Sequence, residues 1–147
     1  MRQFVVIMAL ILAGSAAAQA GPREDALQVV DAWTRAFSNS DIEAMAGLYA
    51  PDALFVGTGS RTVVTQPEGI RAYFEKGFLT DRPRSARVYD TSVAVLSDTS
   101  VVVTGLDTIS NTRDGQVTSR NGRVTFVVAK RGSEWKIVHF HRSAAPN

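Results

Sequence analysis

Both histidines of the chain, His139 and His141, lie two residues apart near the C-terminus, and Arg142 follows them directly. Imidazole can act as a general base, a hydrogen-bond donor or a metal ligand, and a guanidinium can bind an anion. The surrounding segment, residues 134–143, alternates with the period of a β-strand. This period places Trp135, Ile137, His139, His141 and Ser143 on one face, and Lys136, Val138, Phe140 and Arg142 on the other. Neither face is polar throughout, so we expect both to be covered.

We expect no metal centre and no bound cofactor. The chain has no cysteine and only two histidines, which are too few ligands for a closed metal site. The sequence also contains no glycine-rich phosphate loop and no nucleophile motif. Each histidine is therefore interpreted either as a residue that lines a cavity or as a buried, hydrogen-bonded residue of the core.

A second group of residues could abstract a proton beside a carbonyl. That chemistry needs a carboxylate base and a donor to the developing oxyanion, held close together. The catalytic candidates are Asp52, Tyr73 and His139, with Tyr49 as a further hydroxyl. Asp52 follows Pro51 at the end of a predicted helix pair, so it can equally be a turn or capping residue.

Residues 1–20 have the pattern of a secretory signal peptide. Arg2 precedes an apolar run, and Ala18-Gln19-Ala20 fits the cleavage rule, with cutting before Gly21. We expect a bacterial protein that is periplasmic or secreted; the alternative is an uncleaved N-terminal anchor. Without Arg2 the chain has fifteen basic and fourteen acidic residues, so we expect no binding to nucleic acid and none to a membrane after cleavage.

The remaining residues, 21–147, predict a single domain that begins with helices. Apolar residues at helical spacing predict helices over residues 24–37, 41–48 and 67–78. Ser40 with Glu43, and Thr65 with Glu68, have the spacing of capping boxes at the second and third helices. Between these two helices, residues 53–56 predict a short strand that forms a hairpin with residues 61–64.

From Ala86 onward the apolar period changes from helical to that of strands. Strands are predicted over residues 86–96, 100–112, 116–130 and 134–143, joined by short turns. Asn121-Gly122 can be read as a hairpin turn or as a bulge in one long strand, and we favour the bulge. The order predicts an α+β fold, in which three early helices pack on a strongly curved antiparallel sheet and leave a conical cavity at one end.

Three segments of the chain resemble the NTF2-like, or SnoaL-like, superfamily: residues 41–45, 48–55 and 68–74. The stretch from Ile137 to Ser143, followed by Ala145-Pro146, resembles the terminal motif of the association (hub) domain of calcium/calmodulin-dependent protein kinase II. Bacterial SgcJ/EcaC-type proteins are an equally good match. The resemblance covers about residues 25–146 and implies the same cone-shaped fold.

This resemblance implies homo-oligomers, built on a dimer that uses the outer face of the sheet. It also implies a deep pocket that holds small carboxylates through arginines, one of which matches Arg142. Other positions of that pocket align with Ile70, Leu106 and Phe126, which are apolar, so most of the anion clamp is absent. Arg142 can therefore bind an anionic ligand or pair with a carboxylate at the dimer interface.

Two functions follow. The first is a non-catalytic binding domain that self-associates and holds a small organic ligand in its cavity. Its predicted ligand-binding residues are His139, His141, Arg142, Trp33, Tyr49, Phe55 and Tyr73. The alternative is a cofactor-free isomerase, dehydratase or hydrolase of the SnoaL-like kind, which requires a carboxylate inside the cone within reach of a histidine.

Overall fold

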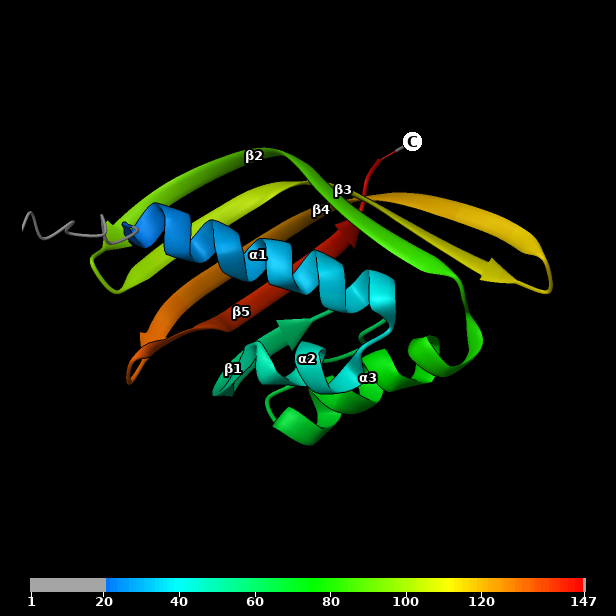
Figure 1. Ribbon diagram of the computed structural model, residues 1–147, viewed down its shortest axis with the longest axis horizontal. Helices are drawn as coiled ribbons and strands as arrows, with labels where there is room; N and C mark the ends of the chain where they lie inside the picture. The colour runs from blue at the N-terminus through cyan, green and yellow to red at the C-terminus, as the bar shows by residue number, and fades with distance from the viewer. Residues whose placement is uncertain (1–20, 147) are drawn as a thin grey trace, which may run out of the picture.

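The computed structural model describes residues 21–146, so the predicted signal peptide lies outside the described residues. Three helices and five strands make up this part of the chain (Figure 1). In chain order they are α1 (Pro22–Asn39), α2 (Ile42–Gly47), β1 (Tyr49–Val56), α3 (Pro67–Thr80), β2 (Arg84–Ser97), β3 (Ser100–Arg113), β4 (Gln116–Arg131) and β5 (Glu134–Ala144). The predicted α+β class is confirmed, and most predicted boundaries lie within two residues of the observed ones.

One curved, open sheet carries the fold, with the strand order β1-β5-β4-β3-β2. Strands β2 to β5 form an antiparallel meander, as the short turns between them predict. Helix α1 lies across the concave side of the meander, and α2 and α3 lie beside β1 (Figure 1). We call the side of the sheet that faces α1 the inner face and the opposite side the outer face.

Strand β1 pairs differently from the prediction. It runs parallel to β5, with Tyr49 opposite Ile137 and Phe55 opposite Phe140. The predicted hairpin with residues 61–64 forms only in part, as a single antiparallel bridge between Phe55 and Val64. Pairing with β5 extends the main sheet and buries Phe55 completely, which a local hairpin at the edge would not achieve.

Both predicted capping boxes are wrong. Only two residues separate α1 from α2, and Ser40 adopts a left-handed conformation that ends α1. Asp41 caps α2 instead: its Oδ1 accepts a hydrogen bond of 2.9 Å from the backbone N–H of Ala44. Glu43 forms an ion pair with Arg71 of α3, which ties the two helices together. At α3, Gln66 occupies the N-cap position and makes no side-chain cap.

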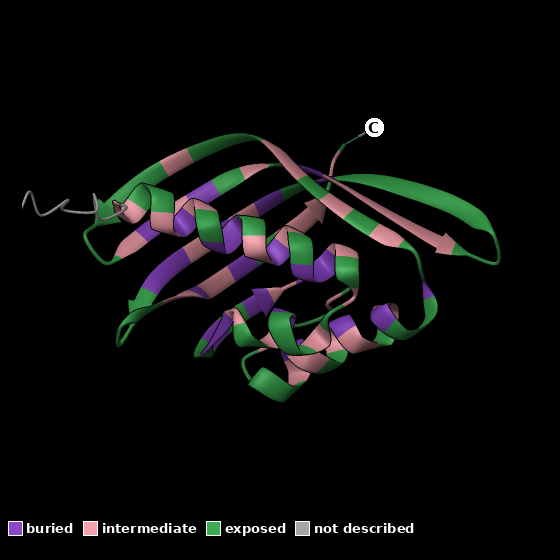
Figure 2. Cartoon of the chain, in the orientation of Figure 1, coloured by how far each residue is buried: buried purple, intermediate pink, exposed green. Residues whose placement is uncertain are grey.

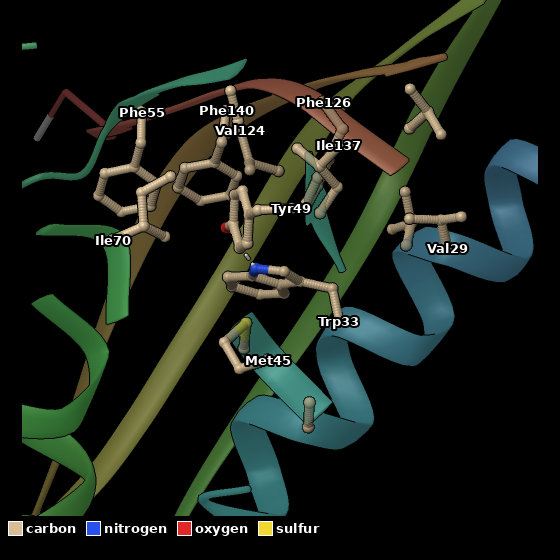
Figure 3. Close-up of a cluster of buried hydrophobic side chains, with 14 of the residues drawn as sticks. Val29, Trp33, Met45, Tyr49, Phe55, Ile70, Val124, Phe126, Ile137 and Phe140 are labelled. Carbon is tan, nitrogen blue, oxygen red and sulfur yellow. Dashed lines mark hydrogen bonds between the residues drawn. The ribbon is translucent and has the colours of Figure 1, made fainter. Parts of the chain in front are cut away.

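Aromatic side chains fill the space between α1 and the inner face (Figure 3). Trp33 of α1 lies at their centre, and its ring stacks at 5.4 Å on both Phe37 and Phe140. The indole Nε1–H donates a hydrogen bond of 3.0 Å to the hydroxyl of Tyr49, so the polar atom of this buried ring has a partner. Buried residues form a stripe along α1 and the middle of the sheet, whereas the turn between β3 and β4 and the residues next to it are exposed (Figure 2).

Candidate functional site

A pocket of about 370 Å³ lies beside this aromatic core, where α1 and α3 meet strands β2 to β5. Its walls combine aromatic rings with charged side chains. The lining residues are Trp33, Phe37, Thr58, Gly59, Tyr73, Phe74, Gly77, Asp81, Arg84, Ile109, Asn111, Arg120, Phe140 and Arg142. A mixture of apolar surface with a few polar groups is typical of a small-molecule site.

A β-bulge in β5 determines which of its residues reach this pocket. Val128 lies opposite Ile137 and Val127 lies opposite His139, so Val138 is an extra residue in the ladder. The insertion reverses the alternation, and Ile137, Phe140 and Arg142 therefore share the inner face. The predicted face of β5, with Ile137 beside the histidines, is wrong for this reason.

His139 and His141 lie on the outer face, opposite Val127 and Thr125 of β4. His141 is exposed, His139 is half-buried, and neither lines the pocket. The prediction that they form a wall of the cavity is wrong, because the bulge turns them away from it. Partial burial lowers the pKa of His139, and the neighbouring His141 lowers it further.

Arg142 lines the pocket and forms an ion pair inside the same chain. Its Nε and Nη2 donate hydrogen bonds of 2.7 Å to the two carboxylate oxygens of Asp107 on β3. Its Nη1 donates a third, of 2.8 Å, to the hydroxyl of Thr58. Asp107 is fully buried, and a buried carboxylate requires such a partner. The charge of Arg142 is therefore already balanced by a residue that the sequence analysis did not identify.

Gly122 leaves the space that this ion pair occupies. A Cβ at this position would lie 2.5 Å from Arg142 Nη2 and 2.5 Å from Asp107 Oδ1. Residues 121 and 122 pair in unbroken register with β3, with Gly122 opposite Asp107. The predicted bulge at Asn121-Gly122 is wrong, and the alternative hairpin turn is absent as well. The glycine is needed for close packing and not for a turn.

The predicted catalytic residues are not brought together in the pocket. Asp52 is exposed on β1, and Arg131 binds both of its carboxylate oxygens, at 3.1 and 2.8 Å. That ion pair lowers the pKa of Asp52. Tyr73 does line the pocket, and its hydroxyl accepts a hydrogen bond of 3.4 Å from Gly59 N–H. Asp52, Tyr73 and His139 therefore occupy three separate places.

The remaining predicted ligand-binding residues divide between pocket and core. Trp33 lines the pocket, whereas Tyr49 and Phe55 are buried in the core and do not reach it. Burial raises the pKa of the Tyr49 hydroxyl well above its ordinary value. The positions that align with the arginine pocket of the hub domain, Ile70, Leu106 and Phe126, do not line the pocket.

Asp81 and Arg84 are pocket residues that the sequence analysis missed. Arg113 binds both oxygens of Asp81, at 2.7 and 3.0 Å, and Asn111 donates to Asp81 Oδ2 at 3.1 Å. The hydrogen bond from Arg113 holds the pKa of Asp81 below its usual range. Both residues lie between the third predicted helix and the first strand of the predicted meander, and the charges of the run Asp81-Arg82-Pro83-Arg84 are the signal that could have identified them.

Within residues 21–146, no group of three or more histidine, aspartate and glutamate side chains is arranged to hold a metal ion. None of the helices in that range is long and apolar enough to cross a membrane.

Comparison with known proteins identifies the family. The SnoaL-like domain family matches residues 26–147, and this protein belongs to it. A solved structure from Xanthomonas campestris, provisionally described as a calcium/calmodulin-dependent protein kinase II association domain, is 28% identical. That match covers 100% of this chain and 99% of the other, with a TM-score of 0.77. A search of curated proteins finds no significant match.

Two other solved structures share the fold at lower identity. One, from Streptomyces avermitilis, is provisionally described as a dehydratase of the NTF2-like family. It is 17% identical, over 84% of this chain and 97% of its own, with a TM-score of 0.75. A ketosteroid isomerase-like protein from Erwinia carotovora atroseptica is 19% identical, over 85% and 97%, with a TM-score of 0.73. These matches establish the NTF2-like fold and leave the activity of this chain open.

Proposed function

We propose that this protein is an exported binding domain, which holds a small organic molecule in the pocket beside Trp33 and self-associates, without catalysing a reaction. The observation that carries the proposal is the pocket itself, which combines an aromatic wall with three arginines, Arg84, Arg120 and Arg142. Such a lining suits an organic molecule better than a purely polar solute or an ion.

The state of the acidic groups supports binding without catalysis. A general base needs a pKa near the working pH and free access to the substrate proton. Asp107 is held by Arg142, and Asp81 is held by Arg113 and Asn111. The pKa of Asp81 is lowered, which makes its carboxylate a weaker base. Neither histidine lines the pocket, so neither can serve as the general base in place of these carboxylates.

Tyr73 supports a second candidate function. Its hydroxyl lines the pocket and could donate a proton or stabilise a developing oxyanion, as an isomerase or dehydratase requires. The relatives described as a dehydratase and as ketosteroid isomerase-like support the same alternative. Conversion of the bound molecule by the wild-type protein, abolished in a Tyr73→Phe variant, would favour this alternative over simple binding.

Self-association is supported by the outer face of the sheet. Val127 and His139 lie opposite each other there and are only half-buried within one chain. The relative from Xanthomonas campestris, matched over its whole length, is described as an association domain. A second copy that covers this face would remove these apolar atoms from water.

Native mass spectrometry of the protein purified from its own host tests the proposal. We expect a subunit that begins at Gly21, a dimer or larger assembly, and a small molecule retained at one copy per subunit. A monomer at micromolar concentration would contradict self-association. If the purified protein retains no small molecule and binds none that is added, the binding function is contradicted.

A pair of lysine substitutions locates the interface. Val127→Lys places a charge on the outer face and should convert the assembly to monomers in sedimentation velocity. Leu79→Lys changes a residue of α3 that is already 70% exposed and should leave the assembly unchanged. Equal behaviour of the two variants would exclude the outer face of the sheet as the interface.

A further inference from the structure

The outer face of the sheet contains a surface without lysine, arginine, aspartate or glutamate. Two rows of residues cross it, each with one residue from every strand, and all of their side chains are exposed or half-buried within one chain. The first row consists of Leu54, His139, Val127, Val102 and Ala94. The second row consists of Val56, His141, Thr125, Thr104 and Ser92. We call these ten residues the uncharged band.

The uncharged band has the composition of a contact surface. The core of a protein interface is depleted of charged residues, and its apolar side chains leave water when the partner binds. Leu54 is 45% exposed in a single chain. The hydroxyls of Thr104 and Thr125 form a hydrogen bond of 2.9 Å with each other, so burial would not leave them without partners. The band therefore suits the second copy that the proposed self-association requires.

His139 and His141 are the two groups of the uncharged band that titrate near neutral pH. The residues directly beside them on β1 and β4 carry no charge; these are Leu54, Val127, Val56 and Thr125. Among residues 21–146, neither imidazole forms an ion pair with a carboxylate. A positive charge on either ring therefore has no counter-ion within the described part of its own chain.

The charged residues that flank the histidines do not supply a counter-ion either. On β1 the nearest charged residue is Asp52, whose carboxylate is already bound by Arg131. On β4 the nearest is Arg123, and on β5 the nearest are Lys136 and Arg142. These three residues are cations, so none of them stabilises a protonated imidazole. Protonation of the band therefore adds positive charge to a region whose free neighbours are already positive.

The surroundings of His139 already disfavour its protonated form within one chain. Partial burial lowers its pKa most and His141 lowers it further, while a hydrogen bond with the backbone of Leu54 acts in the opposite direction. A second copy over the uncharged band would increase the desolvation and bring two more imidazoles to the same surface. Acid would then enclose several positive charges without counter-ions. Burial of unpaired charge opposes association.

We infer that the uncharged band is a proton-sensitive contact between two copies of this chain, which persists while His139 and His141 are neutral and separates when they are protonated. This inference rests on the proposed self-association and adds its regulation. Free subunits bind more protons than the assembly does, so acid shifts the equilibrium toward free subunits. The ordinary pKa of imidazole, about 6.5, places the change between about pH 7 and about pH 5.

The test is sedimentation velocity at about pH 7.5 and about pH 5.5, on either side of the imidazole pKa. For the wild type, the dissociation constant of the assembly should rise about a hundredfold or more in acid, because several imidazoles gain protons together. The double variant His139→Gln/His141→Gln should assemble equally at both pH values. His141→Lys, which is charged at both, should assemble poorly at both. Leu79→Lys, the control on exposed α3, should respond as the wild type does.

The outcomes separate this inference from the self-association on which it rests. If the wild type assembles equally at both pH values, self-association stands and the proton-sensitive contact is wrong. If the double glutamine variant dissociates in acid as the wild type does, the assignment to the histidines is wrong. A wild type that is monomeric at both pH values overturns self-association and the inference together.

Circular dichroism at each pH establishes whether the subunits are folded. Acid unfolding of the wild type in place of dissociation to folded monomers would overturn the inference. Should the double variant fail to assemble at neutral pH, His139→Gln and His141→Gln are measured singly. Each should lose part of the response to acid, and a full response in both would again exclude the histidines.

Discussion

The two faces of β5 differ in what the sequence shows and in what the structure places there. The outer face carries His139 and His141, the residues whose chemistry is easiest to recognise. The inner face carries Phe140 and Arg142, which line the pocket. The extra residue Val138 in β5 determines which side chains face the pocket and which face the outer side of the sheet. Recognisable chemical groups do not by themselves locate a site, because a bulge can turn them away from the cavity.

The same contrast separates two ion pairs between arginine and aspartate. Asp107 and Arg142 are paired at the inner face, where the aspartate is fully buried, whereas Asp52 and Arg131 are paired in solvent. The geometry of the two pairs is similar, with contacts of 2.7 and 2.8 Å between the closest charged atoms. Their surroundings, and therefore their effects on stability, should differ strongly.

The largest expected effect is the loss of an aromatic ring from the inner face. Phe140 is 2% exposed and packs against Trp33, Phe55 and Phe126. Phe140→Ala should lower the free energy of unfolding by about 3–5 kcal/mol, because it leaves a cavity in the core. Urea unfolding measures the loss. His141→Ala, one residue along the same strand, should change stability very little, and equal losses would contradict the assignment of the faces.

Removal of the buried carboxylate should have the next largest effect. Asp107→Asn leaves the charge of Arg142 in the protein interior without a counter-ion and should cost about 3 kcal/mol in urea unfolding. Asp52→Asn is the matched control and should cost far less, because its partner Arg131 remains solvated. A comparable loss in both variants would show that burial does not distinguish the two pairs.

A smaller effect is expected from a single hydroxyl group of the core. Tyr49→Phe removes the acceptor of the Trp33 indole N–H and leaves a buried donor without a partner. The expected loss of unfolding free energy is about 2 kcal/mol. Tyr89→Phe on β2 is the control, since no hydrogen bond to the hydroxyl of Tyr89 occurs within residues 21–146. Thermal unfolding of the two variants side by side provides the comparison.

The smallest effect belongs to the outer face and depends on pH. The pKa of His139 is lowered in the folded chain, mainly by desolvation, so the unfolded chain binds more protons below about pH 6.5. Stability should therefore fall as the pH decreases from about 6.5 through the folded pKa. Carboxylates with lowered pKa values, such as Asp81, add their own loss only near and below about pH 4.

Substitution of each histidine isolates this contribution. His139→Gln should flatten the dependence of stability on pH between about 6.5 and 4, whereas His141→Gln should leave most of it. The measurement is the urea midpoint across that range. An unchanged slope in His139→Gln would show that another group causes the dependence.

The fold could be predicted because its signals are local. Trp33 and Phe37 recur at helical spacing, and the change of period at Ala86 marks the start of the meander. The parallel pairing of β1 with β5 could not be predicted, because the apolar pattern of β1 indicates a strand but not which strand it pairs with. The cap of α2 was misplaced by one residue, because Ser40 and Asp41 are both suitable capping residues and only the tight corner decides between them.

The site was less predictable because its contacts are long-range. Asp107 and Arg142 lie 35 residues apart, and their pairing depends on the register of three strands and on the space left by Gly122. Arg142 was identified from its place beside the histidines and from a family resemblance, but its partner was missed. Arg84 was missed because it lies between a predicted helix and a predicted strand, whereas its position depends on the end of α3 and the ring of Phe37.

Native mass spectrometry of three proteins from the same host tests most directly whether function resides on the inner face. These are the wild type, the double variant His139→Gln/His141→Gln, and Ile109→Trp, whose larger side chain fills the pocket. We predict that the double histidine variant retains the same small molecule as the wild type, and that Ile109→Trp loses it. Loss of the molecule from a folded double histidine variant, with retention by Ile109→Trp, would contradict the account.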